Sequence, residues 1–537
     1  MVLTIRGGTV VDPVDGLWTA DVAIDGGRVV AVGEGLAESA RLRGGTVLDA
    51  DGRLVLPGLV DAHSHADARV LDEDVQLALL RQGVTSVLAG QDGVSFAPGD
   101  GAYATDYFGP INGPHPTYRG GGVGALLDGY AGTTRVNVGY LVPAGTVRHE
   151  VMGAGRDRPN AAQLAAMVRA VEAGLAEGAL GLSSGLDYVP GCFADAAELA
   201  ALCAPVTAAG ALYVTHMRGY EESAPRGLAE VEDICRRSGV AAHVSHLHAR
   251  ADLLDGLLAG ARDRGLDLTF DAYPYARGFT LLSMAVLPAD LVAQGAQVVT
   301  SRLRTADGRE QVRAQLARLA ATPGAGDHLA AGWPSRMRVA SAGSAAYAWT
   351  EGRTLTEAAA SRDPAATDLD ATDLALRMLG ESALRVTVVL DPPSPRTDAE
   401  LARTFRHPEA MGGSDGIYLG GHPHPRAWGA FARLLATGAQ GREEGAWPRL
   451  ADLLSLRPVE RFGLGARGRV TGGAVADLVL VDPAALADHA TPEHPTTLAT
   501  GIDDVLVAGT PVLTGGALTS HLAGAPLRRS RPGRPTP

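Results

Sequence analysis

The chain of 537 residues contains no lysine, so all 47 of its basic residues are arginine. Arginine keeps its proton, whereas lysine is the basic side chain that can form a Schiff base or a carbamate. Every mechanism that requires a lysine is therefore excluded.

Other features are also scarce. Three cysteines (Cys192, Cys203 and Cys235) cannot all pair and show no metal-ligand spacing, which is typical of a reduced cytoplasmic protein. No run of about 18 apolar residues predicts a membrane span, and the N-terminus shows no signal-peptide pattern. A net charge of −13 argues against binding to nucleic acid or to an anionic membrane. We expect a cytoplasmic protein, with a homo-oligomer as an open alternative.

The two ends of the chain differ in pattern from the middle. Short alternating runs with glycine pairs, such as "ADVAIDGGRVVAVG" and "RVTGGAVADLVLVDP", predict one small β-sandwich domain built from residues 1–57 and 465–537. Between them, residues 58–464 alternate apolar strand-like runs with helical stretches such as "NAAQLAAMVRAVEAGLAEG". Eight such runs predict a (β/α)8 barrel of the α/β class.

Two features complicate this barrel. The run "ALRVTVVLD" also has the pattern of a strand, so a doubly wound open sheet stays an alternative. The segment of about residues 282–345 is longer than a normal connection between two barrel elements, and we interpret it as an insertion over the barrel mouth.

Polar residues with metal-binding chemistry follow several of the predicted strands. His63 and His65 are two apart and would face the same way on a strand, while His216, His246 and Asp415 end three other runs. Each histidine alone is more often structural, but convergence at the carboxyl ends of barrel strands is where chemistry is expected. Imidazole and carboxylate together suit Zn²⁺ and related transition metals.

Another carboxylate, Asp92, follows the apolar run "VTSVLAG" within "GQDG". An aspartate in this position is usually a turn residue, because its side chain hydrogen-bonds to nearby backbone. A functional interpretation therefore requires something in the chain that needs a negative charge there.

A set of motifs occurs in order across roughly residues 50–510: "LPGLVDAHSHAD", "GLSSGLDYVPG", "YVTHMR", "VSHLHA", "DAYPY", "GGSDG" and "PHPRAWG". The set resembles the amidohydrolase superfamily and, more closely, its N-acyl-D-amino-acid deacylases. The resemblance implies one or two metal ions, zinc or another divalent transition metal, held by His63, His65, His216, His246 and Asp415. Two close metals need a bridging anion. The deacylases have a cysteine in the turn that "GQDG" matches, which makes Asp92 the candidate bridge.

The resemblance also implies hydrolysis of the amide bond of a small molecule, with Asp415 as the acid–base residue. Tyr188 and Arg426 match family positions that hold the α-carboxylate of the substrate. Arg218 could add positive charge, although an ion pair with Glu221 or Glu222 is an alternative. His248 stands where the family has a lysine.

Other functions stay open at this point. A D-specific dipeptidase or carboxypeptidase and a cyclic-amide hydrolase use the same scaffold, although hydantoinase-type enzymes typically need the carbamylated lysine that this chain lacks. A barrel that has lost its metals would be non-catalytic, which the complete ligand set disfavours. The acyl group, the side chain and the stereochemistry of the substrate are not determined by the sequence.

Overall fold

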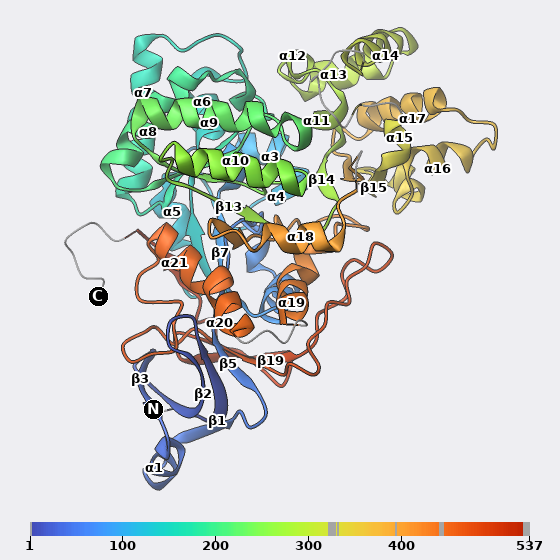
Figure 1. Ribbon diagram of the computed structural model, residues 1–537. Coiled ribbons are helices and arrows are strands. Elements are labelled where there is room, and N and C mark those ends of the chain that lie inside the picture. The colour runs from blue at the N-terminus through green and yellow to red at the C-terminus, as the bar shows by residue number, and fades with distance from the viewer. Residues whose placement is uncertain (1–2, 321–328, 330–331, 393–394, 440–444, 530–537) are drawn as a thin grey trace.

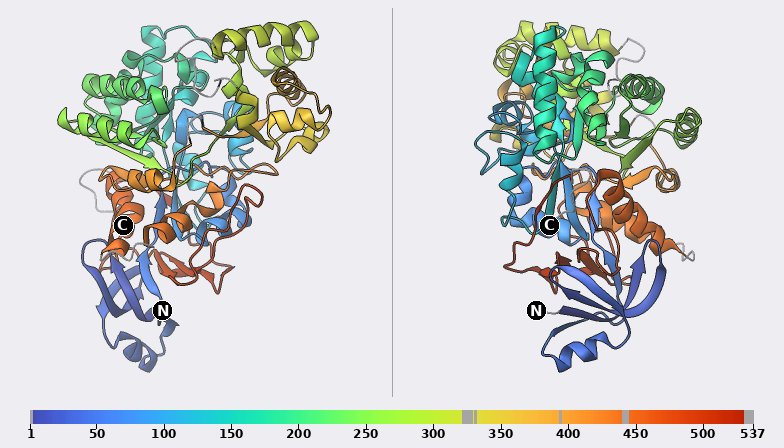
Figure 2. Two further views of the ribbon diagram at one scale, coloured as in Figure 1. Left: turned by 45° about the vertical axis from the view of Figure 1, so that its right-hand side comes forward. Right: turned by 90° about the vertical axis from the view of Figure 1, so that its left-hand side faces the viewer.

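Eight short parallel strands form the centre of the molecule. Figures 1 and 2 show the computed structural model, which describes residues 3–320, 329, 332–392, 395–439 and 445–529. The strands are buried on both faces, as in the six-residue run "VTSVLA", because side chains fill the interior and helices cover the outside. In chain order they are β6 (Leu59–Asp61), β7 (Val84–Ala89), β8 (Asn137–Tyr140) continued by β9 (Val142–Pro143), β10 (Gly181–Gly185), β11 (Leu212–His216), β12 (Ala241–Val244), β13 (Leu268–Ala272) and β17 (Ala410–Gly412).

Backbone hydrogen bonds close these strands into a barrel. One parallel ladder runs β6–β7–β8 and another runs β9–β10–β11–β12–β13–β17. Between the last strand and the first, the N–H of Ala62 donates to the carbonyl of Gly412 (3.1 Å), and the N–H of Asp415 donates to that of His63 (2.8 Å). The predicted (β/α)8 barrel is confirmed. The alternative open sheet fails because β16 (Thr387–Leu390), the strand in "ALRVTVVLD", pairs in a separate antiparallel sheet.

The helices around the barrel follow from local sequence. α7 begins at a reciprocal cap between Asn160 and Gln163, and α9 buries Leu228, Val231 and Cys235 at helical spacing. None of the described helices is long and apolar enough to cross a membrane. The helices of this layer are α2 (Glu73–Leu80), α3 (Ala102–Tyr107), α4 (Gly109–Asn112), α5 (Val123–Asp128), α6 (Ala144–Met152), α7 (Ala161–Ala176), α8 (Ala196–Ala208), α9 (Ala224–Ser238), α10 (Ala251–Asp263), α18 (Asp398–Thr404), α19 (Arg426–Ala439), α20 (Ala446–Ala451) and α21 (Arg457–Phe462).

The two ends of the chain meet in one nine-stranded sheet below the barrel (Figure 1). β18 pairs antiparallel with β5, with Leu478 opposite Pro57, so N-terminal and C-terminal strands share a ladder. Ile5, Val55 and Leu480 pack in the same apolar core. The domain limits at residues 57 and 465 stay a prediction. The elements are β1 (Leu3–Asp12), β2 (Gly16–Asp25), β3 (Arg28–Gly33), α1 (Leu36–Leu42), β4 (Thr46–Asp49), β5 (Leu54–Pro57), β18 (Leu478–Val481), β19 (Ile502–Val507), β20 (Thr510–Thr514) and β21 (Ala517–Leu518).

A helical segment with its own small sheet lies beside the barrel, at the upper right of Figure 1. Its strands pair antiparallel in the order β14–β16–β15, with Val339 opposite Val388. The segment predicted as an insertion therefore shares a sheet with residues beyond 345. The elements are β14 (Gly278–Leu281), α11 (Leu282–Val286), α12 (Ala289–Val292), α13 (Ala296–Leu303), α14 (Ala306–Ala320), α15 (Trp333–Arg336), β15 (Met337–Ser341), α16 (Leu355–Ala360) and α17 (Asp368–Glu381).

Candidate metal centre

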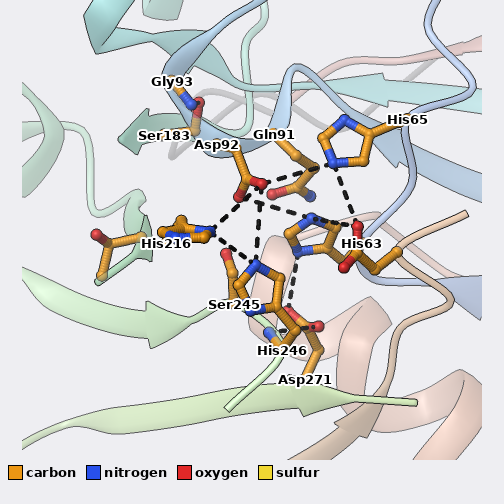
Figure 3. Close-up of polar contacts among 12 residues, drawn as sticks. His63, His65, Gln91, Asp92, Gly93, Ser183, His216, Ser245, His246 and Asp271 are labelled. Atoms are coloured by element: carbon orange, nitrogen blue, oxygen red, sulfur yellow. Dashed lines mark hydrogen bonds and ion pairs between the residues drawn. The ribbon is translucent and has the colours of Figure 1, made fainter. Parts of the chain in front are cut away.

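The six predicted ligands lie together at one end of the barrel. Each stands at or just after the carboxyl end of a strand, where parallel strands direct their following residues to one edge. Figure 3 shows the carboxylate of Asp92 pointing into the space among four imidazoles. The six residues are His63 and His65 after β6, Asp92 after β7, His216 on β11, His246 after β12 and Asp415 after β17.

Asp92 lies nearly equidistant from four histidines. Its Oδ1 is 3.7 Å from Nε2 of His63, and its Oδ2 is 3.6 Å from Nε2 of His65, 3.7 Å from Nδ1 of His216 and 3.8 Å from Nε2 of His246. These separations are too long for hydrogen bonds. They match two ligands of one tetrahedral zinc ion, which stand roughly 3.4 Å apart when each is about 2.1 Å from the metal.

The charge state of Asp92 follows from its neighbours. Burial raises the pKa of this carboxyl. The surrounding imidazoles, His63 first, lower the pKa by a larger amount, so that it lies well below its usual value. The side chain is 3% exposed and ionised. It therefore supplies the negative charge that a cation at this point requires.

The second carboxylate of the centre, Asp415, is held from two sides. Its Oδ1 is 3.3 Å from Nε2 of His65 and 3.8 Å from Nε2 of His63. Its Oδ2 forms an ion pair with Nη2 of Arg426 at 2.8 Å, and Nε of Arg426 donates to its backbone carbonyl at 2.7 Å. Burial raises the pKa of Asp415, but Arg426 and the histidines lower it more, so the carboxylate is ionised.

Three of the candidate ligands have left-handed backbone conformations. The φ angles are 57° for Asp92, 35° for His246 and 47° for Asp415, a region that side chains other than glycine rarely adopt. Gly93, next to Asp92, also has a positive φ, and a Cβ there would lie 2.7 Å from the backbone nitrogen of Gly185. Such strain is concentrated at functional sites. Here the turn after β7 aims the carboxylate inward.

The donor atoms fit a divalent metal. Among the described residues, Nε2 of His63 and Oδ1 of Asp92 are buried without a hydrogen-bond partner, which is costly unless something else satisfies them. In the described part of the chain, two groups of three side chains each bring their ligand atoms within 4.8 Å of one another. One group is His63, Asp92 and His246, and the other is His63, His65 and Asp415. The residues present therefore suit one or two divalent transition-metal ions.

His216 reaches the centre but lies outside both triads. Its Nδ1 is 3.1 Å from Nε2 of His246 and 3.0 Å from the hydroxyl of Tyr188. Its other ring nitrogen, Nε2, is 3.1 Å from Oδ2 of Asp187, a half-exposed carboxylate that the sequence did not single out. This contact orients the imidazole of His216.

A further buried carboxylate, Asp271, was also not predicted. Its Oδ2 is 3.4 Å from Nδ1 of His63 and 3.0 Å from Nε2 of His243, and its Oδ1 accepts the backbone N–H of His246 at 2.9 Å. A carboxylate on the outer nitrogen of a ligating histidine fixes its tautomer and turns the other nitrogen to the metal. The sequence signal was available, because Asp271 lies at the end of β13, next to the last residue of that strand.

The predicted substrate-binding residues take different positions. The hydroxyl of Tyr188 donates to Oδ2 of Asp92 at 3.3 Å. His248 stacks on Tyr220, and its Nδ1 donates to the carbonyl of His246 at 2.6 Å. Both Tyr188 and His248 border a cavity of about 520 Å³ that reaches down to the two carboxylates.

The two predicted arginines are already engaged. Arg426 is fully buried between Asp415 and the ring of Tyr273, 4.5 Å from its centroid, and is absent from the described cavity wall. Arg218 borders the cavity, but it pairs with Glu230 at 3.1 Å rather than with Glu221 or Glu222. It also donates to the carbonyls of Leu186, Cys192 and Ala194.

Comparisons with known proteins identify relatives that cover almost the whole chain. Residues 46–513 match the amidohydrolase family. An N-acyl-D-glutamate deacylase of Alcaligenes xylosoxydans xylosoxydans is 32% identical over 98% of this chain and 96% of its own. A D-aminoacylase crystal structure is 29% identical with a TM-score of 0.79, covering 98% of this chain and 99% of its own. An N-acyl-D-glutamate deacylase structure from Bordetella bronchiseptica, complexed with zinc and a phosphonate inhibitor, is 27% identical with a TM-score of 0.77, over 98% and 99% of the two chains. The chain belongs to the amidohydrolase family.

Proposed function

We propose that this protein is a metal-dependent hydrolase of N-acyl-D-amino acids, which releases a carboxylate and a D-amino acid in the cytoplasm. The family, the full-length deacylase relatives and three free cysteines support this proposal. The observation that carries it is Asp415, a buried ionised carboxylate that contacts the histidine cluster and borders the cavity.

His63, His65, Asp92, His216 and His246 would hold one or two divalent ions, with zinc as the expected metal. When bound, such an ion polarises a substrate carbonyl and lowers the pKa of water. The carboxylate of Asp92 takes the place of a carbamylated lysine, which this chain cannot form because it has no lysine.

Proton transfer falls to Asp415. Its pKa lies below the usual value, so the group is ionised, which is the form that can accept a proton from the attacking water. Arg426 contacts both its side chain and its carbonyl, which fixes the orientation of the carboxylate. The proton then passes to the leaving nitrogen, so that the amine departs in its neutral form. Tyr188 and His248 border the cavity and are the proposed contacts for the substrate.

A substrate panel tests the proposal. Zinc-loaded protein should release D-amino acids from N-acetyl-D-amino acids and act much more slowly on the L-enantiomers, as measured by amine release. Removing the metal with a chelator should abolish turnover, and added zinc should restore it. D-dipeptides and hydantoins are the comparison substrates. Faster hydrolysis of either than of any N-acyl-D-amino acid would replace the proposed substrate class.

A further inference from the structure

Arg396 is a buried cation on the cavity wall. It lies in the loop before α18, its side chain is 7% exposed, and it borders the same cavity as Asp92 and Asp415. Its Nε has no hydrogen-bond partner among the described residues, and its Nη2 makes one long contact of 3.4 Å with the carbonyl of Ala276. Burying a guanidinium with unused donors is unfavourable unless a ligand satisfies them.

A carboxylate already lies near this guanidinium. Oε1 of Glu221 is 3.9 Å from Nε of Arg396 and also 3.9 Å from Nε2 of His248. Both separations are too long for hydrogen bonds, so Glu221 does not accept the N–H of Arg396 at Nε. Glu221 therefore offsets part of the charge of Arg396 without occupying its N–H donors.

The neighbouring candidates are less suited to bind an anion. Arg426 also has buried donors without a hydrogen-bond partner among the described residues, Nη1 and Nη2, but it pairs with Asp415 and is not part of the described cavity wall. Arg218 borders the cavity but uses its donors on three carbonyls and Glu230. His248 uses its Nδ1–H on the carbonyl of His246, which leaves its Nε2 without a proton when the ring is neutral.

We propose that Arg396 binds a carboxylate of the substrate and is a specificity-determining residue of this enzyme. The proposal rests on the proposed function. The carboxylate belongs either to the α-position of the amino acid or to an acidic side chain, and both present the same planar anion to the guanidinium. Arg426, by contrast, acts through Asp415 and is a positioning residue.

The test compares Arg396→Gln with Arg403→Gln, a matched control on α18 whose exposed side chain pairs with Asp252 and Asp255. Three substrates separate the sources of the carboxylate: N-acetyl-D-leucine, its amide, and N-acetyl-D-glutamate. Losing a charge-assisted contact should lower kcat/KM by roughly 10–100-fold on the substrates that use it. Arg403→Gln should match wild type on all three.

The kcat/KM values of Arg396→Gln on the three substrates decide which carboxylate, if any, Arg396 binds. If the α-carboxylate is the ligand, Arg396→Gln affects both acids equally and leaves the amide unchanged. If the side-chain carboxylate is the ligand, only N-acetyl-D-glutamate is affected. Equal losses on all three substrates, or no loss on any, overturn the proposal. Arg396→Lys should recover part of the lost activity, which separates a missing charge from damage to the fold. Arg426→Gln should instead lower kcat on all three.

Binding measurements separate this proposal from the proposed function. Calorimetry with N-acetyl-D-leucine and N-acetyl-D-glutamate gives a Kd that does not depend on turnover. A wild type that binds these acids without hydrolysing them refutes the proposed function, while the ratio of Kd values between Arg396→Gln and wild type still decides the role of Arg396. A wild type that does neither overturns both.

Discussion

Asp92→Asn is the substitution that tests the metal centre most directly. Asparagine has the shape of aspartate without its charge, and it tolerates the left-handed backbone that this position requires, with a φ of 57°. Alanine at the same angle would add roughly 1–2 kcal/mol of backbone strain, so the effect of the lost charge could not be separated from the effect of the strain. The asparagine variant therefore isolates the carboxylate.

The expected loss can be worked from the observed distances. The ligand nitrogens around Asp92 lie 3.6–3.8 Å away, so a cation among them is closer still to the carboxylate. Two unit charges about 4 Å apart interact by about 4 kcal/mol at an effective dielectric constant of 20, and a divalent ion interacts more strongly. Each 1.4 kcal/mol is a factor of ten. Asp92→Asn should therefore weaken zinc binding by about 10³-fold or more.

The assay is zinc affinity in chelator-buffered solution, together with the metal content after dialysis. Asp106→Asn, at an exposed carboxylate on α3, is the control and should match wild type. Asp92→Cys should retain metal, because thiolate is also a good zinc ligand. If Asp92→Asn keeps both the metal content and the affinity of wild type, Asp92 is a turn residue and the proposed centre is wrong.

Three further predictions concern Asp415, Asp271 and His115. Asp415→Asn should keep its metal but lower kcat by roughly 10²–10⁴-fold, because an amide cannot accept the proton of water; a kcat near that of wild type would contradict this role. Asp271→Asn should weaken zinc binding roughly 10–100-fold in a calorimetric titration, because His63 loses the carboxylate on its outer nitrogen; unchanged affinity would make Asp271 only structural. Burial lowers the pKa of His115 to about 4, and its Nδ1 accepts two backbone N–H groups, so the folded protein holds this ring neutral. An unfolded histidine titrates near 6.5, so the neutral ring of His115 contributes its full share to the free energy of unfolding above about pH 6.5. This contribution, up to roughly 3 kcal/mol, is lost as the pH falls towards 4. His115→Gln should reduce the fall in urea midpoint between pH 7 and 4.5, while His494→Gln, at an exposed site, should not.

The barrel and the convergence of the candidate ligands could be predicted because both depend on local pattern. Each of the eight apolar runs became a barrel strand, and the carboxyl ends of parallel strands converge whatever their connections. The run around Val388 also became a strand, but alternation of residues does not say which sheet a strand joins. Asp92 could be singled out because the missing lysine left the centre without its usual anion.

The surroundings of the ligands depend on contacts that the sequence does not encode locally. Arg396 lies in a loop with no periodic pattern, and only the folded chain brings it to the cavity that Asp415 borders. The substrate-binding role expected for Arg426 stays a prediction; the sequence did not show that its guanidinium pairs with Asp415, which only the folded chain brings to it. Asp271 carried the same strand-end signal as Asp415 and would have been found by applying that rule to β13 as well.

The nine-stranded sheet has a consequence for biosynthesis. β5 ends at Pro57, but its partner β18 begins at Leu478, roughly 420 residues later in synthesis. At about 5–20 residues per second, the ribosome needs roughly 20–80 s to supply that partner. Throughout this interval, the N-terminal strands present an unpaired apolar edge while the barrel grows behind them, and exposed edges of this kind promote aggregation. Nascent chains stalled before residue 478 should therefore associate with chaperones more strongly than chains that have passed β19.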